Sequence, residues 1–244
     1  MRVLVFILLL IGTASAQPMR FFTGAMGQYS PIVKNGLVCW LDGGNSVSAN
    51  GVSNTWLDLS GNSNNISLSG NTFSTSYNGY FSFSSANNSL TLSGSGLYQN
   101  IATLMVWLYY TTSQYSQVIY LGNAAIAGVG IIINNGSGAS GNKATVLFGG
   151  KSYSAAGSVT LTANTWYCLA LSIANTPLCS FYSNTTLVGS TTTVPNGAGV
   201  YSTQMAMASQ NFTGGLGQAL IYNRALSSTE ITQNYNATKG RYGY

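Results

Sequence analysis

The sequence predicts an all-β protein: a two-sheet antiparallel sandwich of the jelly-roll kind with one short C-terminal helix. Short stretches rich in β-branched and aromatic residues recur along the 244 residues, each bounded by Gly, Asn or Ser, which is typical of antiparallel strands joined by turns. Apolar and polar residues alternate in Gly79–Phe83 and Ser89–Leu92, which indicates one face on a core and one in water. So many strands must pack face to face or close into a barrel.

The strand candidates are spread along the chain without an internal repeat. The Gly/Ser-rich stretches between them are short enough for hairpin loops, so we expect a single domain. The clearest candidates, in chain order, are Leu37–Leu41, Gly79–Phe83, Ser89–Leu92, Ala102–Thr111, Gln117–Leu121, Gly130–Ile133, Thr145–Phe148, Trp166–Ile173, Leu178–Tyr182 and Leu216–Tyr222.

One helix is well signalled near the C-terminus. The segment Ser227-Ser228-Thr229-Glu230 has the spacing of a capping box, and Ile231, Asn234 and Tyr235 follow at helical intervals. Gly240 is expected to end this helix.

The N-terminus reads as a secretory signal peptide over residues 1–16. Arg2 precedes an apolar run, and Ala14-Ser15-Ala16 forms a small-residue cleavage site before Gln17. The run is about half of the roughly 20 residues that a membrane-spanning helix needs, and no later run approaches that length. We therefore expect a secreted protein without a membrane span after signal removal. Residues 17–32 lack periodicity and form an N-terminal arm or lead-in to a domain over residues 33–244.

The surface is expected to be nearly uncharged. Eight basic and three acidic residues give a net charge of +5. The basic residues are scattered except near the C-terminus, whereas nucleic-acid binders gather them on one stripe. No nucleic-acid partner is therefore expected.

Three cysteines, Cys39, Cys168 and Cys179, permit at most one internal disulfide. Equally, all three can be small core residues. There is no Cys/His cluster and no histidine, so a zinc site is not expected.

Six glycosylation sequons fit a secreted chain, although a composition rich in Asn, Ser and Thr generates such triplets by chance. The possible glycosylation sites are Asn65, Asn87, Asn135, Asn184, Asn211 and Asn236.

The three carboxylates have structural interpretations. Glycosidases generally need two carboxylates across the scissile bond, but Glu230 belongs to the capping box, and Asp42 and Asp58 lie in turn-forming contexts. Alternatively, Asp42 or Asp58 binds calcium weakly, helped by neighbouring Asn side chains; no other cofactor is expected. Because histidine is absent, a Ser-His-Asp or Cys-His constellation cannot form. The prediction is a protein that is not an enzyme.

Aromatic and amide side chains are abundant, with 16 Tyr, 9 Phe and 4 Trp. Aromatic rings stack on sugars, while Asn and Gln bond their hydroxyls. Trp40, Trp107 and Trp166 lie in apolar strand runs, which favours core packing. Trp56 lies outside such a run. The candidate ligand-binding residues are therefore Trp56, Asp58, Asn62, Asn64 and Asn65.

Several segments together resemble laminin-G-like domains of the concanavalin A-like lectin/glucanase group. They are Gly36–Asn45, Thr55–Asn65, Gly79–Phe83, Leu104–Leu108, Thr165–Leu171 and Ile221–Ser227. The resemblance runs from about Val33 to Gly243 and implies a concanavalin A-like jelly roll whose first and last strands are adjacent. The family's enzymatic branch carries a strand with several acidic residues, and this sequence has none, so the resemblance implies a non-catalytic member.

Two functions follow as expectations. The first is a secreted, non-catalytic surface module that recognises glycans like a lectin or adheres to a surface protein. The alternative is a structural subunit of an extracellular assembly, such as a virion decoration, capsid-associated or filament protein. Low charge favours such self-assembly or capsid binding because little repulsion opposes lateral packing.

Overall fold

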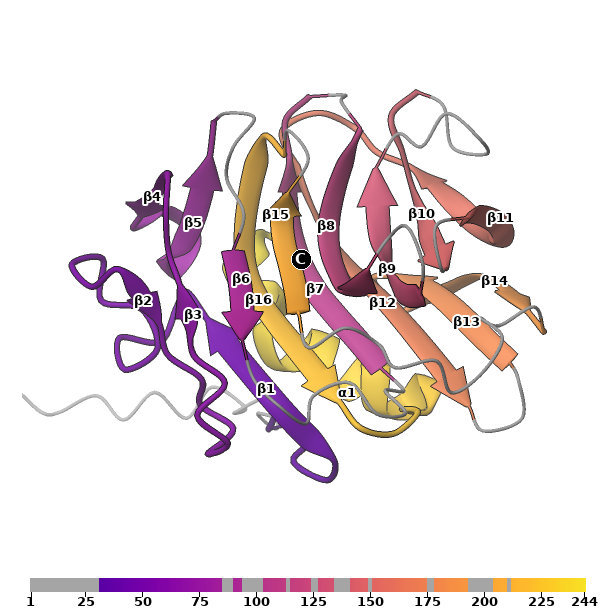
Figure 1. Ribbon diagram of the computed structural model, residues 1–244, viewed down its shortest axis with the longest axis horizontal. Coiled ribbons are helices and arrows are strands. Elements are labelled where there is room, and N and C mark those ends of the chain that lie inside the picture. Colours follow the sequence, from indigo (N-terminus) through magenta and orange to yellow (C-terminus); the bar gives the residue numbers. More distant parts are fainter. Residues whose placement is uncertain are drawn as a thin grey trace, which may run out of the picture.

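The computed structural model describes residues 31–84, 90–93, 103–112, 115–123, 127–133, 141–148, 151–174, 178–192, 204–209 and 212–244. Two antiparallel sheets of eight strands each face one another (Figure 1), which confirms the predicted all-β sandwich. The predicted signal peptide and all of the arm except its last two residues lie outside the described residues.

The first sheet brings the two ends of the domain together. Strand β1 (Leu37–Asp42) pairs with β16 (Gly214–Tyr222), so that Trp40 lies opposite Leu220 and Asp42 opposite Gln218. This confirms that the first and last strands are adjacent. The sheet runs in the order β14 (Thr186–Thr191), β13 (Leu178–Ser183), β12 (Thr165–Ala174), β7 (Thr103–Tyr110), β16, β5 (Tyr80–Phe83) and β4 (Asn71–Ser74).

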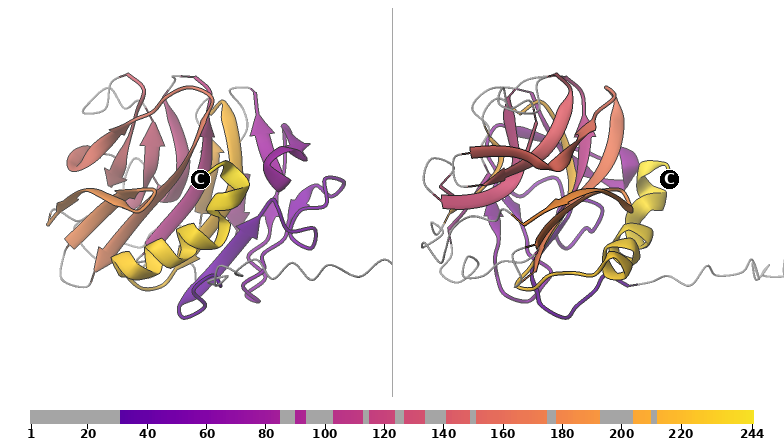
Figure 2. Two further views of the ribbon diagram at one scale, coloured as in Figure 1. Left: turned by 180° about the vertical axis from the view of Figure 1, so that it is seen from behind. Right: turned by 90° about the vertical axis from the view of Figure 1, so that its right-hand side faces the viewer.

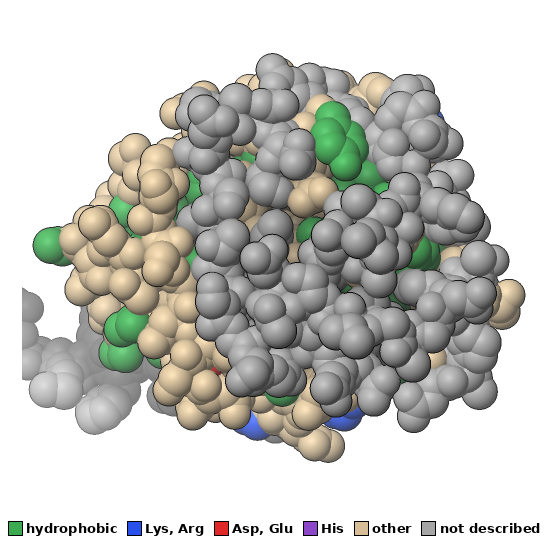
Figure 3. All heavy atoms as spheres, in the orientation of Figure 1, with side chains coloured by type: hydrophobic (Ala, Val, Ile, Leu, Met, Phe, Trp, Pro, Cys, Tyr) green, Lys and Arg blue, Asp and Glu red, His purple; other side chains and the backbone are tan. Residues whose placement is uncertain are grey.

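The second sheet supplies the other wall of the sandwich. Its order is β11 (Lys151–Thr160), β10 (Lys143–Phe148), β9 (Ala127–Ile133), β8 (Ser116–Asn123), β15 (Gln204–Ser209), β6 (Leu90–Ser93), β3 (Ile66–Ser67) and β2 (Thr55–Trp56). In the space-filling view of Figure 3, few described side chains carry a charge, as the composition predicts.

The main core fills the space between the sheets. Phe81, Val106 and Leu108 of the first sheet meet Ile131 and Val146 of the second, and all five are buried. On β1, Leu37, Cys39 and Leu41 are buried while Val38 and Trp40 between them are only partly so, as alternation along a strand requires.

A second core lies on the outer face of the first sheet. Helix α1 (Ser228–Thr238) and the short 3-10 helix η2 (Lys239–Tyr242) cross this face (Figure 2). Trp107 stacks on Tyr242 with ring centroids 4.2 Å apart, and its Nε1 donates to Thr238 Oγ1 at 2.9 Å. Strands β7 and β16 are therefore buried on both faces, which explains why their sequences are largely apolar and do not alternate with polar residues.

The predicted capping box is confirmed at Ser227 and Glu230. The end of the helix differs from the prediction: α1 stops at Thr238, and Gly240 lies inside η2, whose C-cap is Gly243 with φ 88°. Within the described residues, no helix is long and apolar enough to cross a membrane.

The three cysteines are buried free thiols. Cys39 and Cys179 belong to the core between the sheets, and Cys168 to the core under the helix. Burial raises the pKa of all three thiols, so they remain protonated. The structure thus favours the interpretation of core residues over a disulfide.

Candidate functional site

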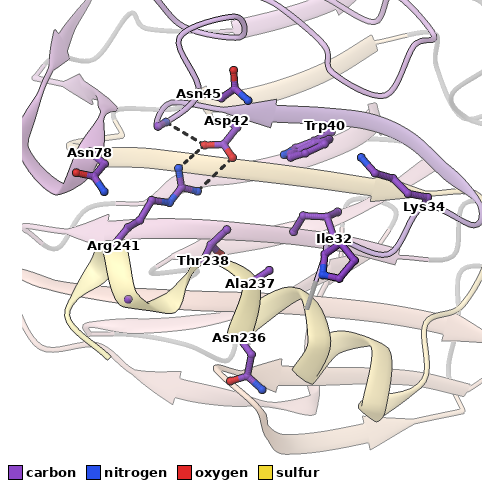
Figure 4. Close-up of a pocket in the computed structure, with 13 residues that line it drawn as sticks. Ile32, Lys34, Trp40, Asp42, Asn45, Asn78, Asn236, Ala237, Thr238 and Arg241 are labelled. Carbon is purple, nitrogen blue, oxygen red and sulfur yellow. Dashed lines mark hydrogen bonds and ion pairs between the residues drawn. The ribbon is translucent and has the colours of Figure 1, made fainter. Parts of the chain in front are cut away.

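A groove of about 640 Å³ lies between β1 and the C-terminal helices. Lys34 and Trp40 lie at one end, and Asn78 and Arg241 at the other (Figure 4). Asn78 belongs to the short helix η1 (Ser76–Asn78). The amides of Asn45 and Asn236 also line the groove. An aromatic ring, several amides and charged groups therefore converge on one concave surface.

The floor of the groove contains an ion pair. Arg241 Nη1 donates to Asp42 Oδ1 at 2.6 Å and its Nη2 to Oδ2 at 3.2 Å. Gln218 Nε2 also donates to Oδ2, at 3.0 Å, and Gly44 N to Oδ1, at 2.9 Å. Such a two-pronged arrangement fixes the guanidinium plane as well as its charge.

This pairing corrects the calcium interpretation of Asp42. Both carboxylate oxygens accept protein hydrogen bonds, and the Arg241 guanidinium occupies the position beside the carboxylate that a cation would need. Among the described residues there is no group of three or more His, Cys, Asp or Glu that could hold a metal ion.

Gly44 makes the ion pair possible. A Cβ atom at this position would collide with Arg241 Nη1. The sequence indicated a turn at Asp42-Gly43-Gly44. This turn also leaves the space that the Arg241 guanidinium occupies beside Asp42.

The aromatic end of the groove consists of Trp40 and Lys34. Lys34 Nζ lies 3.8 Å from the centroid of the Trp40 ring, within the range of a cation–π contact. Lys34 forms no ion pair with any described residue. Trp40 is partly exposed, and its buried Nε1 has no hydrogen-bond partner among the described residues.

Trp40 lines the groove, which the sequence did not predict. Its position in an apolar run favoured core packing, which Trp107 and Trp166 do show, being 0% and 3% exposed. The available signal was alternation: Trp40 lies between Cys39 and Leu41, so it must point to the face opposite theirs.

The predicted ligand-binding residue Trp56 has a different role. Its side chain is 0% exposed and packs edge-to-face on Phe81, with ring centroids 4.8 Å apart. The prediction that Trp56 contacts a ligand is therefore corrected: the strand β2 directs its indole into the core between the sheets.

The other predicted site residues do lie together, in a loop that secures β1. Asp58 Oδ1 accepts from the backbone N–H of Trp40 at 2.8 Å, and its Oδ2 accepts from Asn64 N at 2.9 Å. The Asn62 and Asn64 amides donate to the Val38 carbonyl, at 3.2 and 2.7 Å. Asn65 Oδ1 accepts from Asp58 N at 2.9 Å. Asp58 is thus engaged with the protein rather than open to calcium, and the loop positions Trp40.

Three of the six sequon asparagines lie within the described residues. Asn65 and Asn236 are exposed, and Asn236 lines the groove, whereas Asn184 is partly buried and accepts from Cys168 N at 3.0 Å. Asn87, Asn135 and Asn211 lie outside the described residues.

The model of the concanavalin A-like lectin/glucanases superfamily matches residues 76–232. The chain belongs to this superfamily. No curated protein matches the chain in sequence.

Solved structures share the superfamily fold. The sialidase of Trypanosoma rangeli, in complex with sialic acid, superposes with a TM-score of 0.64 at 16% identity, over 86% of this chain and 34% of the sialidase. Domain 4 of AbnA, an extracellular arabinanase from Geobacillus stearothermophilus, was solved in complex with arabinotriose. It superposes with a TM-score of 0.64 at 15% identity, over 82% of this chain and 98% of that domain. The 244-residue chain, a member of the concanavalin A-like superfamily, thus spans about a third of the length of the sialidase. At sequence identities of 15 to 16%, these similarities show a shared fold alone.

The prediction that the protein is not an enzyme is contradicted by these comparisons. The similar structures are a sialidase and a domain of an arabinanase, so this concanavalin A-like fold occurs in carbohydrate-active enzymes. The prediction rested on a count of carboxylates. A scarcity of carboxylates argues only against the glycosidase mechanism that uses two of them. It does not decide whether the protein is an enzyme.

Proposed function

We propose that this protein recognises glycans through the groove between β1 and the C-terminal helices. The observation that carries the proposal is the partly exposed residue Trp40, with Lys34 over its ring, at one end of a concave surface lined by amides. The face of an indole packs on the apolar face of a sugar ring, while amides bond its hydroxyl groups.

The groove is organised before any ligand arrives. The backbone of Trp40 is held by Asp58, and the Arg241 guanidinium by both oxygens of Asp42. Asn45 Oδ1 accepts from Val47 N at 2.9 Å, which orients the Asn45 amide. Preorganisation of this kind lowers the entropy lost on binding.

The comparisons support a carbohydrate ligand. Domain 4 of AbnA, which this chain covers almost completely, was solved with arabinotriose, and the sialidase with sialic acid. These two sugars are the first probes to use. Lys34, which has no ion-pair partner among the described residues, would favour a glycan that also carries a carboxylate.

The test is a glycan array followed by calorimetric titration of every glycan that binds, including arabinotriose and sialylated oligosaccharides. Trp40→Ala should weaken binding about tenfold, the equivalent of an aromatic contact of about 1.4 kcal/mol. Tyr115→Ala is the matched control, because Tyr115 is 40% exposed and does not line the groove. If no glycan binds the wild-type protein at about 1 mM, or if both variants bind equally well, the proposal fails.

We also propose that the protein acts outside the cell, as a module that adheres to glycan-bearing surfaces. The support is the signal-peptide pattern of residues 1–16. Mass spectrometry of the protein recovered from the culture medium should find Gln17 at its N-terminus. Recovery only inside the cell, with Met1 or Arg2 first, would contradict secretion.

A further inference from the structure

Four aromatic rings form a shelf on the outer face of the first sheet, beside η2. We call Tyr77, Tyr80, Tyr109 and Trp166 the tyrosine shelf. Trp166 is its centre, with ring centroids 5.5 Å from Tyr77, 5.4 Å from Tyr80 and 5.2 Å from Tyr109. Tyr77 is 43% exposed and Tyr80 and Tyr109 are partly buried, so the tyrosine rings reach solvent.

The register of the sheet assembles this shelf. Trp166 on β12 lies directly opposite Tyr109 on β7, and Tyr109 lies opposite Gly215 on β16. A Cβ at Gly215 would be 2.7 Å from Tyr80 Cδ2. Because glycine leaves this space open, the Tyr80 ring crosses β16 and reaches the rings on β7 and β12.

Tyr77 completes the shelf at the cost of backbone strain. It has φ 53° and ψ 33°, a left-handed conformation that is rare and unfavourable for bulky residues. The conformation places its ring against Trp166 and Tyr109 while nearly half of the residue stays exposed. Burial of the Tyr77 side chain therefore does not account for the strain.

The shelf is continuous with the groove. Tyr77 is followed by Asn78, which lines the groove, and Arg241 of the groove floor is followed by Tyr242, whose ring centroid lies 4.5 Å from that of Trp166. Asn78 and Arg241 lie at the same end of the groove (Figure 4). A chain of sugars that leaves the groove beside Asn78 would next reach Tyr77, its exposed neighbour in sequence.

We propose that the tyrosine shelf is a second saccharide subsite, so that the ligand is an oligosaccharide running from Trp40 past Asn78 onto Tyr77 and Tyr109. This inference rests on the proposed function of the groove. The shelf is built from tyrosine and tryptophan rather than aliphatic residues, with Trp166 buried beneath the three tyrosines. Tyrosine rings offer an apolar face to a sugar ring and a hydroxyl to its oxygens.

The chemistry of Tyr109 agrees with a hydrogen-bonding role. Burial, with the neighbouring hydroxyls of Tyr77 and Tyr80, raises the pKa of Tyr109. The Tyr109 hydroxyl is protonated at neutral pH, as tyrosine hydroxyls ordinarily are, and can donate to a sugar oxygen.

The experiment is a length series, from disaccharide to octasaccharide, of the glycan that the array selects, with arabino-oligosaccharides as the first series. For the wild-type protein, calorimetric affinity should rise with length and then level off. Tyr77→Ala should remove about a tenfold gain for the longer members, as expected for one aromatic contact, and leave the shortest binder unchanged. Tyr77 is the variant of choice because it is the most exposed residue of the tyrosine shelf. Tyr115→Ala is the control, and circular dichroism verifies the fold of both variants.

The outcomes separate the two proposals. If wild-type affinity does not depend on length, or if Tyr77→Ala retains the full gain, the shelf is not a saccharide subsite while the groove still binds glycans. A Tyr77→Ala variant that loses binding to a protein partner, but whose affinity still rises with saccharide length as in the wild-type protein, would assign the shelf to that protein instead. If the wild-type protein binds no saccharide of any length, the proposed function itself fails.

Discussion

Arg241 binds Asp42 across a separation of 199 residues, through two hydrogen bonds that join the last turn of the chain to the end of its first strand. The side chains of the pair are only 16% and 7% exposed. The pair therefore links the edge of the first sheet to η2 and forms the floor of the groove.

Removal of one partner should be costly. Arg241→Ala leaves the Asp42 carboxylate buried with Gln218 and Gly44 as its remaining donors, and we expect a loss of about 3 kcal/mol in the free energy of unfolding. Urea denaturation measures it. The double variant Asp42→Asn, Arg241→Ala should recover part of that loss; equal stability of the single and double variants would show that the buried charge is not the cause.

Gly44→Ala should act through the same pair. The added Cβ collides with Arg241 Nη1, so we expect a loss of about 1 to 3 kcal/mol in the free energy of unfolding, as for other overpacked sites. In the Arg241→Ala background the same substitution should cost much less. Equal costs in the two backgrounds would mean that the close approach of the Asn78 carbonyl, 3.1 Å from the added Cβ, and not the arginine, requires glycine at this position.

Glu230 should make stability depend on pH in the acidic range. Hydrogen bonds from Arg224 lower the pKa of Glu230 to about 2. Because this folded pKa lies below the unfolded value of about 4.3, the unfolded chain binds more protons between the two. The stabilisation is therefore complete above the unfolded pKa and is lost as pH falls towards the folded one.

The size of this effect is limited by exposure, since the Glu230 side chain is 28% exposed, so we expect about 1 kcal/mol. Melting temperatures between about pH 5 and pH 2, compared for the wild-type protein and Glu230→Gln, measure it. The variant should show a shallower decline with acid. Parallel curves would exclude Glu230 as its source.

Trp56 and Trp40 should separate stability from binding. Trp56→Ala empties a fully buried site, so the free energy of unfolding should fall by about 3 to 5 kcal/mol. Trp56→Phe, which keeps most of the ring, should bind glycans as the wild-type protein does. A loss of glycan affinity in a stable Trp56→Phe protein would contradict the assignment of Trp56 to the core.

Local patterns were enough to predict most of the fold. Alternation predicted β5 and β6, apolar runs predicted β7, β12 and β16, and the capping box at Ser227 is confirmed. Six strands were not predicted: β2, β3, β4, β11, β14 and β15. The first three have only two to four residues, which carry too little periodicity. The other three are rich in Ser, Thr, Ala and Gly, so they lack a run of large apolar residues, and their pairing depends on neighbours in the sheet.

The candidate site was predicted only in part. The sequence singled out Asp42, Asp58 and the Asn62–Asn65 loop, but the structure assigns Asp42 to an ion pair and the loop to holding β1. The structure places Trp40 in the lining of the groove and Trp56 in the core, the reverse of the sequence-based expectation. Apolar neighbours in the sequence do not reveal which part of a strand's outer face remains uncovered by a helix.

The sequence by itself determined the all-β class, the C-terminal helix start and the scarcity of charge, since these depend on composition and on residues within a few positions of one another. Only the tertiary structure decided the groove and the tyrosine shelf. Both arise where β16 pairs with β1 and β7, and where the C-terminal turn returns to Asp42. Contacts between residues so far apart in the chain follow from strand order and register, which no local pattern encodes.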